Sequence, residues 1–331
     1  MKVALIGAGN NGAGHMRCVK EIEDIRIVGI ADPELARAEE LAAGVGGKAY
    51  ADHRAMLDAE KPEAVWISSP CFLHAEHTVD CAGAGAHVMC EKPMALTLPD
   101  CDRMIAAADK NNVKLMIGQS TRYIEPLVEL KRIFDSGRLG DLVCSWSVRT
   151  NYHRRQAHAP WRLQGDKSGG IVFEWEVHEI DFVCSFGGKV SQVYAQTAYT
   201  REDAPDFVDH FAAILTFEKS GYASLDASQS CAVGRGGRGF VGTKGAAEAQ
   251  GRDTVRLRMN DADEVELVQV EPGAHITRGL AKLTQDEDFI RAIRQDDASP
   301  VPGEDGRANV EIGLAIVESG RTGQVVKLPL T

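Results

Sequence analysis

The sequence predicts two domains: an α/β domain of the Rossmann type at the N-terminus, followed by an α+β domain built on a large, mostly antiparallel sheet. Strand-like and helix-like segments alternate over the first 120 residues, and a glycine-rich loop follows the first strand. Long β-rich stretches dominate after about residue 123, and 331 residues exceed the usual size of a single domain. We therefore expect domains at 1–122 and 123–331.

In the first domain, short apolar runs alternate with segments of helical periodicity. This alternation indicates a parallel sheet with right-handed crossovers. Thr97 should cap its helix, since a hydroxyl at this position accepts a backbone N–H. The predicted strands are Lys2–Ile6, Arg26–Ala31, Ala64–Ser68, His87–Cys90 and Lys114–Gly118, and the predicted helices are Asn10–Lys20, Pro33–Ala43, Leu73–Ala84 and the segment from Thr97 to Asn111.

In the second domain, several stretches alternate polar and apolar residues, as a sheet with one exposed face does. The glycine-rich segment 232–239 should be a loop or bulge with solvated arginines, and the acidic run Asp286–Asp288 should lie on a solvated helix surface. The predicted strands are Val143–Asn151, Ser191–Thr200, Phe207–Phe217, Tyr222–Ser230, Gly239–Thr243, Val255–Met259 and Val265–Val270, and the predicted helices are Pro126–Ser136, Leu280–Gln295 and Arg307–Ser319.

Composition argues against several classes of partner. The formal net charge of −11 disfavours nucleic acid, because phosphate binding needs a basic face. No stretch approaches the roughly 20 apolar residues of a membrane helix. Glycines interrupt the apolar N-terminal run, and the eight cysteines are scattered without a CxxC pair. We therefore expect a cytoplasmic protein with free thiols and no nucleic-acid or membrane partner.

The segment GAGNNG at 7–12 matches the GxGxxG pattern directly after a strand and at the start of a helix. Gly7 should permit the tight turn, Gly9 should let the backbone approach a pyrophosphate, and Gly12 should let helix and strand pack closely. Asp32 ends the second strand, where it can accept hydrogen bonds from ribose hydroxyls and repel a 2′-phosphate. We therefore predict NAD rather than NADP, bound by Gly7, Gly9, Asn10, Asn11, Gly12 and Asp32.

Two further segments carry candidate catalytic side chains. Glu91 and Lys92 directly follow a predicted strand, and ligands of open parallel sheets bind at the carboxyl ends of the strands. Glu174 and His178 are four residues apart, so on a helix they share one face and can hydrogen-bond. That pairing fits a histidine general base oriented by a carboxylate.

A helical segment also carries thiols and imidazoles at a spacing that could suit zinc. Cys71, His74, His77 and Cys81 lie near one helical face. No second cluster in the sequence completes such a site, so we expect no metal.

Taken together, these segments resemble the Gfo/Idh/MocA family of glucose–fructose oxidoreductase, inositol dehydrogenase and their relatives. The resemblance covers essentially the whole length, and its most specific parts are the EKP element and the later GG…HxxD element. The matching segments are GAGNNGAGH at 7–15, SSPCFLH at 68–74, AGAHVMCEKPMAL at 84–96, GQSTRY at 118–123, SGRLGDL at 136–142 and GG…EWEVHEID at 169–181. The resemblance implies a Rossmann domain, an open-faced antiparallel sheet that often forms homodimers or homotetramers, and a sugar, sugar derivative or cyclitol as substrate.

The resemblance also assigns roles to single positions. The family's EKP lysine matches Lys92, which in relatives touches the nicotinamide ribose and the reacting hydroxyl, and its catalytic histidine matches His178. Glu174 stands where relatives commonly carry Asp, and its side chain is one methylene longer. The implied cofactor contacts further include Ser69, Pro70, His74, Glu91, Lys92 and Arg122, and the implied substrate contacts are Lys92, Asn151, Arg162, Glu174 and His178.

The expected reaction is reversible hydride transfer between a secondary alcohol and nicotinamide, with His178 as the base and Lys92 stabilising the alkoxide. Two alternatives stay open. Some members of this family are glycosidases that oxidise a sugar transiently with tightly held NAD, and the same lysine and histidine would serve. The family also includes a regulator that binds a dinucleotide without catalysis, although the retention of both residues favours an enzyme.

Overall fold

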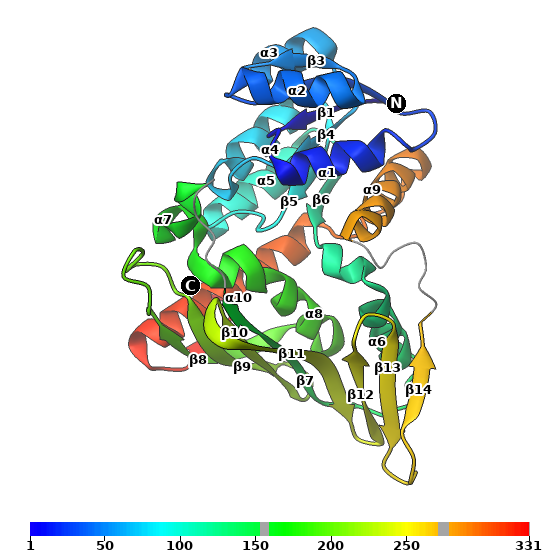
Figure 1. The fold of residues 1–331 in the computed structure, drawn as a ribbon, viewed down its shortest axis with the longest axis vertical. Helices are drawn as coiled ribbons and strands as arrows, with labels where there is room; N and C mark the ends of the chain where they lie inside the picture. The colour runs from blue at the N-terminus through cyan, green and yellow to red at the C-terminus, as the bar shows by residue number, and fades with distance from the viewer. Residues whose placement is uncertain (153–158, 271–277, 331) are drawn as a thin grey trace. The chain divides into compact units, whose positions relative to one another are not determined.

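The computed structural model describes residues 1–152, 159–270 and 278–330, which form two compact units (Figure 1). The first unit comprises Met1–Ser120 and Thr277–Ala308, and the second comprises Thr121–Ile276 and Asn309–Thr331. The sequence placed the segment 277–308 in the second domain. In the structure it belongs to the first unit, because helix α9 (Arg278–Gln295) packs against helix α1 (Asn10–Val19).

The sheet of the first unit is parallel, with the strand order β3-β2-β1-β4-β5-β6. The order reverses between β1 and β4, which is where doubly wound sheets bind dinucleotides. The five predicted strands are confirmed to within one residue at each end, whereas the three-residue β3 was missed. The strands are β1 (Lys2–Ile6), β2 (Arg26–Ala31), β3 (Lys48–Tyr50), β4 (Ala64–Ile67), β5 (His87–Glu91) and β6 (Leu115–Gly118).

Local sequence explains where the helices of this unit begin. Thr97 caps α5 as predicted, since its Oγ1 accepts the N–H of Asp100 at 3.3 Å. Asp52 caps α3 in the same way through the N–H of Ala55 at 2.8 Å, and this helix was missed. Besides α1 and α9, this unit contains α2 (Leu35–Val45), α3 (His53–Glu60), α4 (His74–Gly83) and α5 (Leu98–Lys110).

The described residues of the second unit form a nine-stranded sheet with the order β14-β13-β12-β11-β7-β10-β9-β8-β15. All neighbours are antiparallel except β7 and β10, which confirms the predicted mostly antiparallel sheet. The strands are β7 (Leu142–Tyr152), β8 (Val190–Ala198), β9 (His210–Phe217), β10 (Tyr222–Ser228), β11 (Ser230–Gly242), β12 (Gly245–Gln250), β13 (Thr254–Met259), β14 (Glu266–Gln269) and β15 (Val326–Lys327).

Helices α6 (Glu125–Asp135) and α8 (Val177–Gly187) pack on one face of this sheet. The alternation along β10 follows from that cover: Ala223 and Leu225 are buried, whereas Tyr222 is exposed. The unit also contains α7 (Gly165–Ser168), and α10 (Gly303–Thr322) runs from the first unit into the second. Across the described parts of the chain, no helix combines the length and apolar character that crossing a membrane requires.

The segment 232–239 belongs to β11 and is not a loop. The register with β7 shifts between Ser230 and Arg235, so the predicted bulge is present, and ladder pairing continues from Arg235 to Gly242. Arg235 is exposed and pairs with Asp226. Arg238 was predicted to be solvated, but it donates from Nε and Nη2 to the two carboxylate oxygens of Glu179, both at 2.6 Å.

Glu179 is a fully buried carboxylate that joins α8 to the sheet. Besides Arg238 it accepts the Ser147 hydroxyl at 2.7 Å, and Arg149 Nη1 lies 3.5 Å away. Burial alone would raise the pKa of Glu179, but the Arg238 and Arg149 guanidinium groups and the Ser147 hydroxyl lower this pKa to about 2. The sheet thereby fixes the helix that carries His178.

We expect Glu179→Ala to destabilise the protein by about 3–5 kcal/mol, because it leaves the largely buried Arg238 charge without its carboxylate. The stabilisation by Glu179 is present above the carboxyl's unfolded pKa and is lost as pH falls through the folded value of about 2. Urea unfolding at neutral pH measures the loss, with Glu264→Ala on an exposed turn as the matched control. A loss below about 1 kcal/mol would contradict the assignment.

Candidate functional site

The glycine loop of the first unit has the geometry of a pyrophosphate cradle. Gly7 has φ +96°, and a Cβ there would lie 2.6 Å from the Ser68 carbonyl carbon. A Cβ at Gly12 would lie 2.1 Å from the Gly7 carbonyl oxygen, so only glycine permits this approach of α1 to the loop. A Cβ at Gly9 would meet no described atom within 4 Å, and no described side chain caps α1 there. The first N–H groups of α1, from Asn10 and Asn11 onward, therefore fit a bound phosphate.

Asp32 is fixed beside this loop, directly after β2. Its Oδ2 accepts the N–H of Ala8 and its Oδ1 accepts the N–H of Glu34, both at 2.9 Å. Each carboxylate oxygen keeps a second lone pair, which can accept a ribose hydroxyl. The glycine loop and the Asp32 carboxylate together fit the pyrophosphate and the adenosine ribose of a dinucleotide.

The loop after β4 is joined to the turn after β5 by His74. This buried imidazole lies with Nδ1 2.8 Å from the Pro93 carbonyl oxygen and Nε2 3.0 Å from the Ser69 carbonyl oxygen. Burial lowers the pKa of His74, and the two carbonyl contacts oppose this effect. His74 thus holds the loop containing Ser69 and Pro70 next to the EKP turn. No group of three or more described His, Cys, Asp and Glu residues is arranged to hold a metal ion.

The EKP turn lies at the carboxyl end of β5. Glu91 Oε1 lies 2.8 Å from His15 Nε2, and Glu91 Oε2 accepts the backbone N–H of Lys92 at 3.2 Å. Burial would raise the pKa of Glu91, but hydrogen bonding to His15 and the charges of Lys282 and Lys92 hold it well below its ordinary value. Glu91 is therefore an ionised residue that shapes the turn.

Sequence reasoning missed His15 and misplaced Asp286. Asp286 was expected on a solvated surface, but it is fully buried, 2.7 Å from His15 Nδ1, and accepts the Trp66 indole N–H at 2.8 Å. The signal for this burial was in α9 itself, because Phe289 and Ile290 follow Gln285 and Asp286 by four residues and so share their face.

In the second unit, Glu174 lies in a π-helical turn, Val172–Glu176, that leads into α8. Such turns are rare and occur often at functional sites. Glu174 is buried and forms an ion pair with Arg162, so two predicted substrate contacts lie together. His178 follows in the first turn of α8 and is partly exposed, as is Asn151 at the end of β7. The π-turn was not anticipated, because the sequence prediction assumed a regular helix.

Arg122 is bound within the second unit. Its Nε and Nη2 donate to the two carboxylate oxygens of Asp181 at 2.7 Å each, and Asn309 donates to the same carboxylate at 2.9 Å. This bidentate pair braces α8 three residues beyond His178. The position expected to contact the cofactor therefore has a structural partner that the sequence analysis did not identify.

Comparison with known proteins gives a consistent assignment. Residues 1–119 match the NAD-binding Rossmann fold of the GFO/IDH/MocA oxidoreductase family, and residues 127–248 match the C-terminal domain of that family. The first of these matches identifies residues 1–119 as an NAD-binding domain.

Individual relatives differ in their named activities. The chain is 31% identical to a 2,7-anhydro-N-acetylneuraminate hydratase of Mediterraneibacter gnavus, over 67% of this chain and 60% of that one. It is 28% identical to a myo-inositol 2-dehydrogenase of Thermotoga maritima, over 99% and 98% of the two chains. A structure of levoglucosan dehydrogenase with NADH and levoglucosan has the same fold, with a TM-score of 0.90, 23% identity and full coverage of both chains.

Proposed function

This chain belongs to the Gfo/Idh/MocA oxidoreductase family, and we propose that it transfers a hydride between nicotinamide and a secondary hydroxyl of a sugar, sugar derivative or cyclitol. One observation carries the proposal: Lys92 follows β5 beside the strand-order reversal, in a turn fixed by Glu91 and His74. The names of the myo-inositol and levoglucosan dehydrogenases support this class of substrate.

In this mechanism the protein residues handle the proton and the oxygen charge. Bound NAD supplies the hydride acceptor. His178 takes the proton of the substrate hydroxyl as general base, and the Lys92 ammonium stabilises the negative charge that develops on that oxygen. Glu174 orients His178 or relays its proton, and its ion pair with Arg162 sets the direction of the carboxylate. Arg162 and Asn151 supply hydrogen-bonding groups suited to a polyhydroxylated ligand.

A redox glycosidase is the second candidate function, because one relative is named a hydratase and not a dehydrogenase. A redox glycosidase of this family would oxidise a sugar transiently, lose the leaving group by elimination and then return the hydride to the sugar, so NAD would be regenerated and no free NADH would accumulate. Lys92 and His178 would take the same roles. A screen of sugars, inositols and glycosides followed at the NADH absorbance band separates the two candidates, since only the dehydrogenase produces free NADH.

We expect His178→Ala to lower turnover on the order of 10²–10⁴-fold while NAD affinity changes little, because a general base is lost. Raising the pH should restore part of this activity, since more substrate is then ionised. Lys92→Ala should lower turnover and weaken substrate binding with little rescue by pH, because a fixed positive charge is missing. Glu174→Gln should be milder than either change, since an amide can still hold the imidazole.

Steady-state kinetics over a pH series measure these effects, with Lys219→Ala on an exposed turn as the control for a lost lysine. A kinetic isotope effect with substrate deuterated at the carbinol carbon shows whether hydride transfer limits the rates being compared. Near wild-type turnover in His178→Ala would mean that this histidine is structural and that the proton acceptor lies elsewhere, first at Lys92.

We also expect NAD to bind more tightly than NADP, because the Asp32 carboxylate accepts ribose hydroxyls and repels a 2′-phosphate. Asp32→Ser should narrow the difference between the two dissociation constants. Titration of the protein with both cofactors tests this, with Asp58→Ser on the exposed side of α3 as the control. Equal or tighter binding of NADP to the wild type would refute the assignment.

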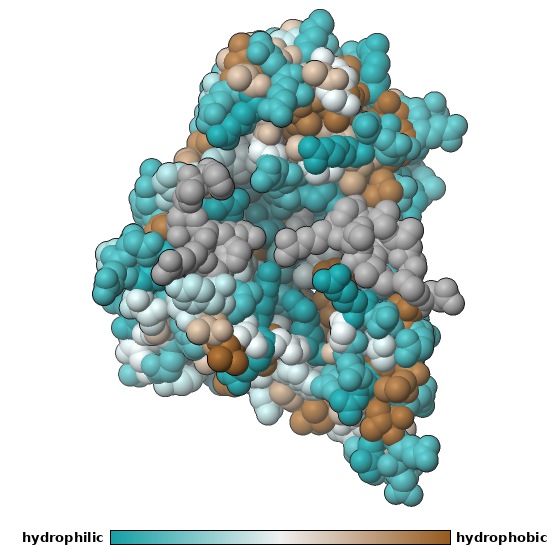
Figure 2. Space-filling view, viewed as in Figure 1, coloured by the Kyte–Doolittle hydropathy of each residue, from teal (hydrophilic) through white to brown (hydrophobic). Residues whose placement is uncertain are grey.

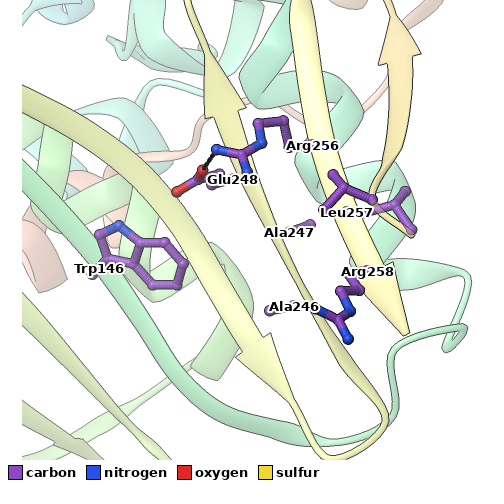
Figure 3. Close-up of a pocket in the computed structure, with 8 residues that line it drawn as sticks. Trp146, Ala246, Ala247, Glu248, Arg256, Leu257 and Arg258 are labelled. Carbon is purple, nitrogen blue, oxygen red and sulfur yellow. Dashed lines mark hydrogen bonds and ion pairs between the residues drawn. The ribbon is translucent and has the colours of Figure 1, made fainter. Parts of the chain in front are cut away.

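The open face of the second unit's sheet supports a proposal of homodimers or homotetramers. Tyr194, Ile214 and Trp146 fall in one register row of paired strands, and the first two are exposed. Trp146 lies against Gly239, where a Cβ would be 2.5 Å from its ring, and lines a hollow of about 150 Å3 with residues of β12 and β13 (Figure 3). Further apolar surface lies over β14 (Figure 2), where Leu267 is exposed. Such a patch is typical of an interface.

We expect light scattering at micromolar concentration to show a dimer or tetramer of the wild type. Ile214→Glu should shift the mass toward the monomer, because a charge in an apolar interface loses its solvation. Val128→Glu, on the exposed side of α6, is the matched control and should keep the oligomer. A wild type that is monomeric at this concentration would contradict the proposal.

A further inference from the structure

The first unit contains a chain of charged groups, centred on the fully buried His15, that takes no part in the proposed proton transfer. The His15 imidazole is fully buried between two carboxylates. Its Nδ1 lies 2.7 and 3.0 Å from the two oxygens of Asp286, and its Nε2 lies 2.8 Å from Glu91 Oε1. Burial of this kind is costly unless every charge is paired.

The geometry fixes the protonation state of His15. A neutral imidazole has one donor and one acceptor nitrogen, so one of its lone pairs would face a carboxylate oxygen. Only the imidazolium donates to both carboxylates. Each carboxylate also accepts a second donor: the Trp66 indole N–H on Asp286 at 2.8 Å, and the Lys92 backbone N–H on Glu91 at 3.2 Å.

The groups around His15 have opposing effects on its pKa, and their net effect is to raise it. Burial lowers the pKa of His15, but Asp286 and Glu91 raise it above the ordinary value against the opposing charge of Lys282. Lys282 Nζ lies 3.7 Å from Glu91 Oε1. Cys18, one turn further along α1, has its pKa raised to about 11 by burial and by nearby Asp286, so it stays neutral at physiological pH.

The cluster connects the helix that follows the glycine loop with the EKP turn that carries Lys92. His15 lies in α1, which begins at the glycine loop, and Glu91 begins the EKP turn. Lys282 of α9 also donates to Asn11 Oδ1 at 2.6 Å, in the first turn of α1. Helix α9 therefore holds the helix at the pyrophosphate cradle and the turn that carries Lys92.

We propose that Asp286 and His15 are positioning residues, which hold the Glu91–Lys92 turn in the conformation that binds NAD for as long as His15 remains an imidazolium. The inference rests on the proposed function only in placing Lys92 beside the nicotinamide. Neither residue needs to touch the cofactor, because both act through Glu91.

Asp286→Asn tests this role with a nearly isosteric change that removes the charge favouring the imidazolium. In the variant His15 loses its proton as pH rises, and the support of Glu91 is lost with it. The dissociation constant for NADH, measured by fluorescence, should stay within about threefold of wild type near pH 6 and rise on the order of tenfold by about pH 8.5. The wild-type constant should stay flat over this range.

Glu287→Gln is the matched control, because it removes one negative charge from the adjacent, exposed position of α9 and should follow the wild type. A flat profile for Asp286→Asn, whether at wild-type affinity or weakened equally at every pH, would overturn the proposal and leave the cluster a purely structural role. These titrations contain no sugar, so a failure to find an oxidisable substrate does not affect them.

The wild type and one further variant, Asp286→Glu, keep the test decisive if Asp286→Asn does not fold. Asp286→Glu retains the charge, so its NADH affinity should be independent of pH even if it is weaker. A wild-type constant or an Asp286→Glu constant that rises tenfold between about pH 6 and 8 would show that His15 titrates in this range, and would overturn the proposal.

Discussion

The contact between Gly12 and the Gly7 carbonyl oxygen is the constraint on which the first unit depends. A Cβ atom at position 12 would lie 2.1 Å from the Gly7 carbonyl oxygen, so α1 can begin this close to the loop only because residue 12 is glycine. The approach brings the first N–H groups of α1 to the reversal of strand order, where a dinucleotide binds. It also sets the position of His15, one turn further along α1, and through His15 the positions of Glu91 and Asp286.

In the second unit, ion pairs with buried carboxylates fix the position of α8, the helix that carries His178. Two carboxylates on either side of one turn of α8 are bound bidentately by arginines, Glu179 by Arg238 and Asp181 by Arg122. Because the arginine fork matches the plane of a carboxylate, each pair fixes rotation as well as distance. The helix that carries His178 is thereby held at two points, from β11 and from the segment before α6. Loss of one partner leaves a buried charge behind, which is why such pairs are costly to break.

Sequence alone predicted what depends on local pattern. Apolar runs located five of the six strands of the first sheet, and the glycine spacing predicted a tight turn at Gly7 and close packing at Gly12, which the positions of their neighbours bear out. Partners distant in the chain could not be found in this way. Asp286 is 271 residues from His15 and lies in an acidic run, so local pattern indicated solvent, whereas the tertiary structure buries it. Arg238 was misjudged for the same reason, since its partner Glu179 is 59 residues away.

The two candidate catalytic side chains have one structural feature in common. Each is adjacent in sequence to an ion-paired carboxylate: Glu91, which is largely shielded from solvent, precedes Lys92, and the fully buried Glu179 follows His178. In both places the neighbouring glutamate is paired with a cation from a distant element, Arg238 in one unit and His15 in the other. A backbone that is fixed at the neighbouring residue restricts where the next side chain begins. The ion pairs of Glu91 and Glu179 therefore offset part of the conformational entropy that is lost when Lys92 and His178 are held in place. Substitution of Glu91 or Glu179 would therefore alter the position of Lys92 or His178, even though neither glutamate takes part in proton transfer.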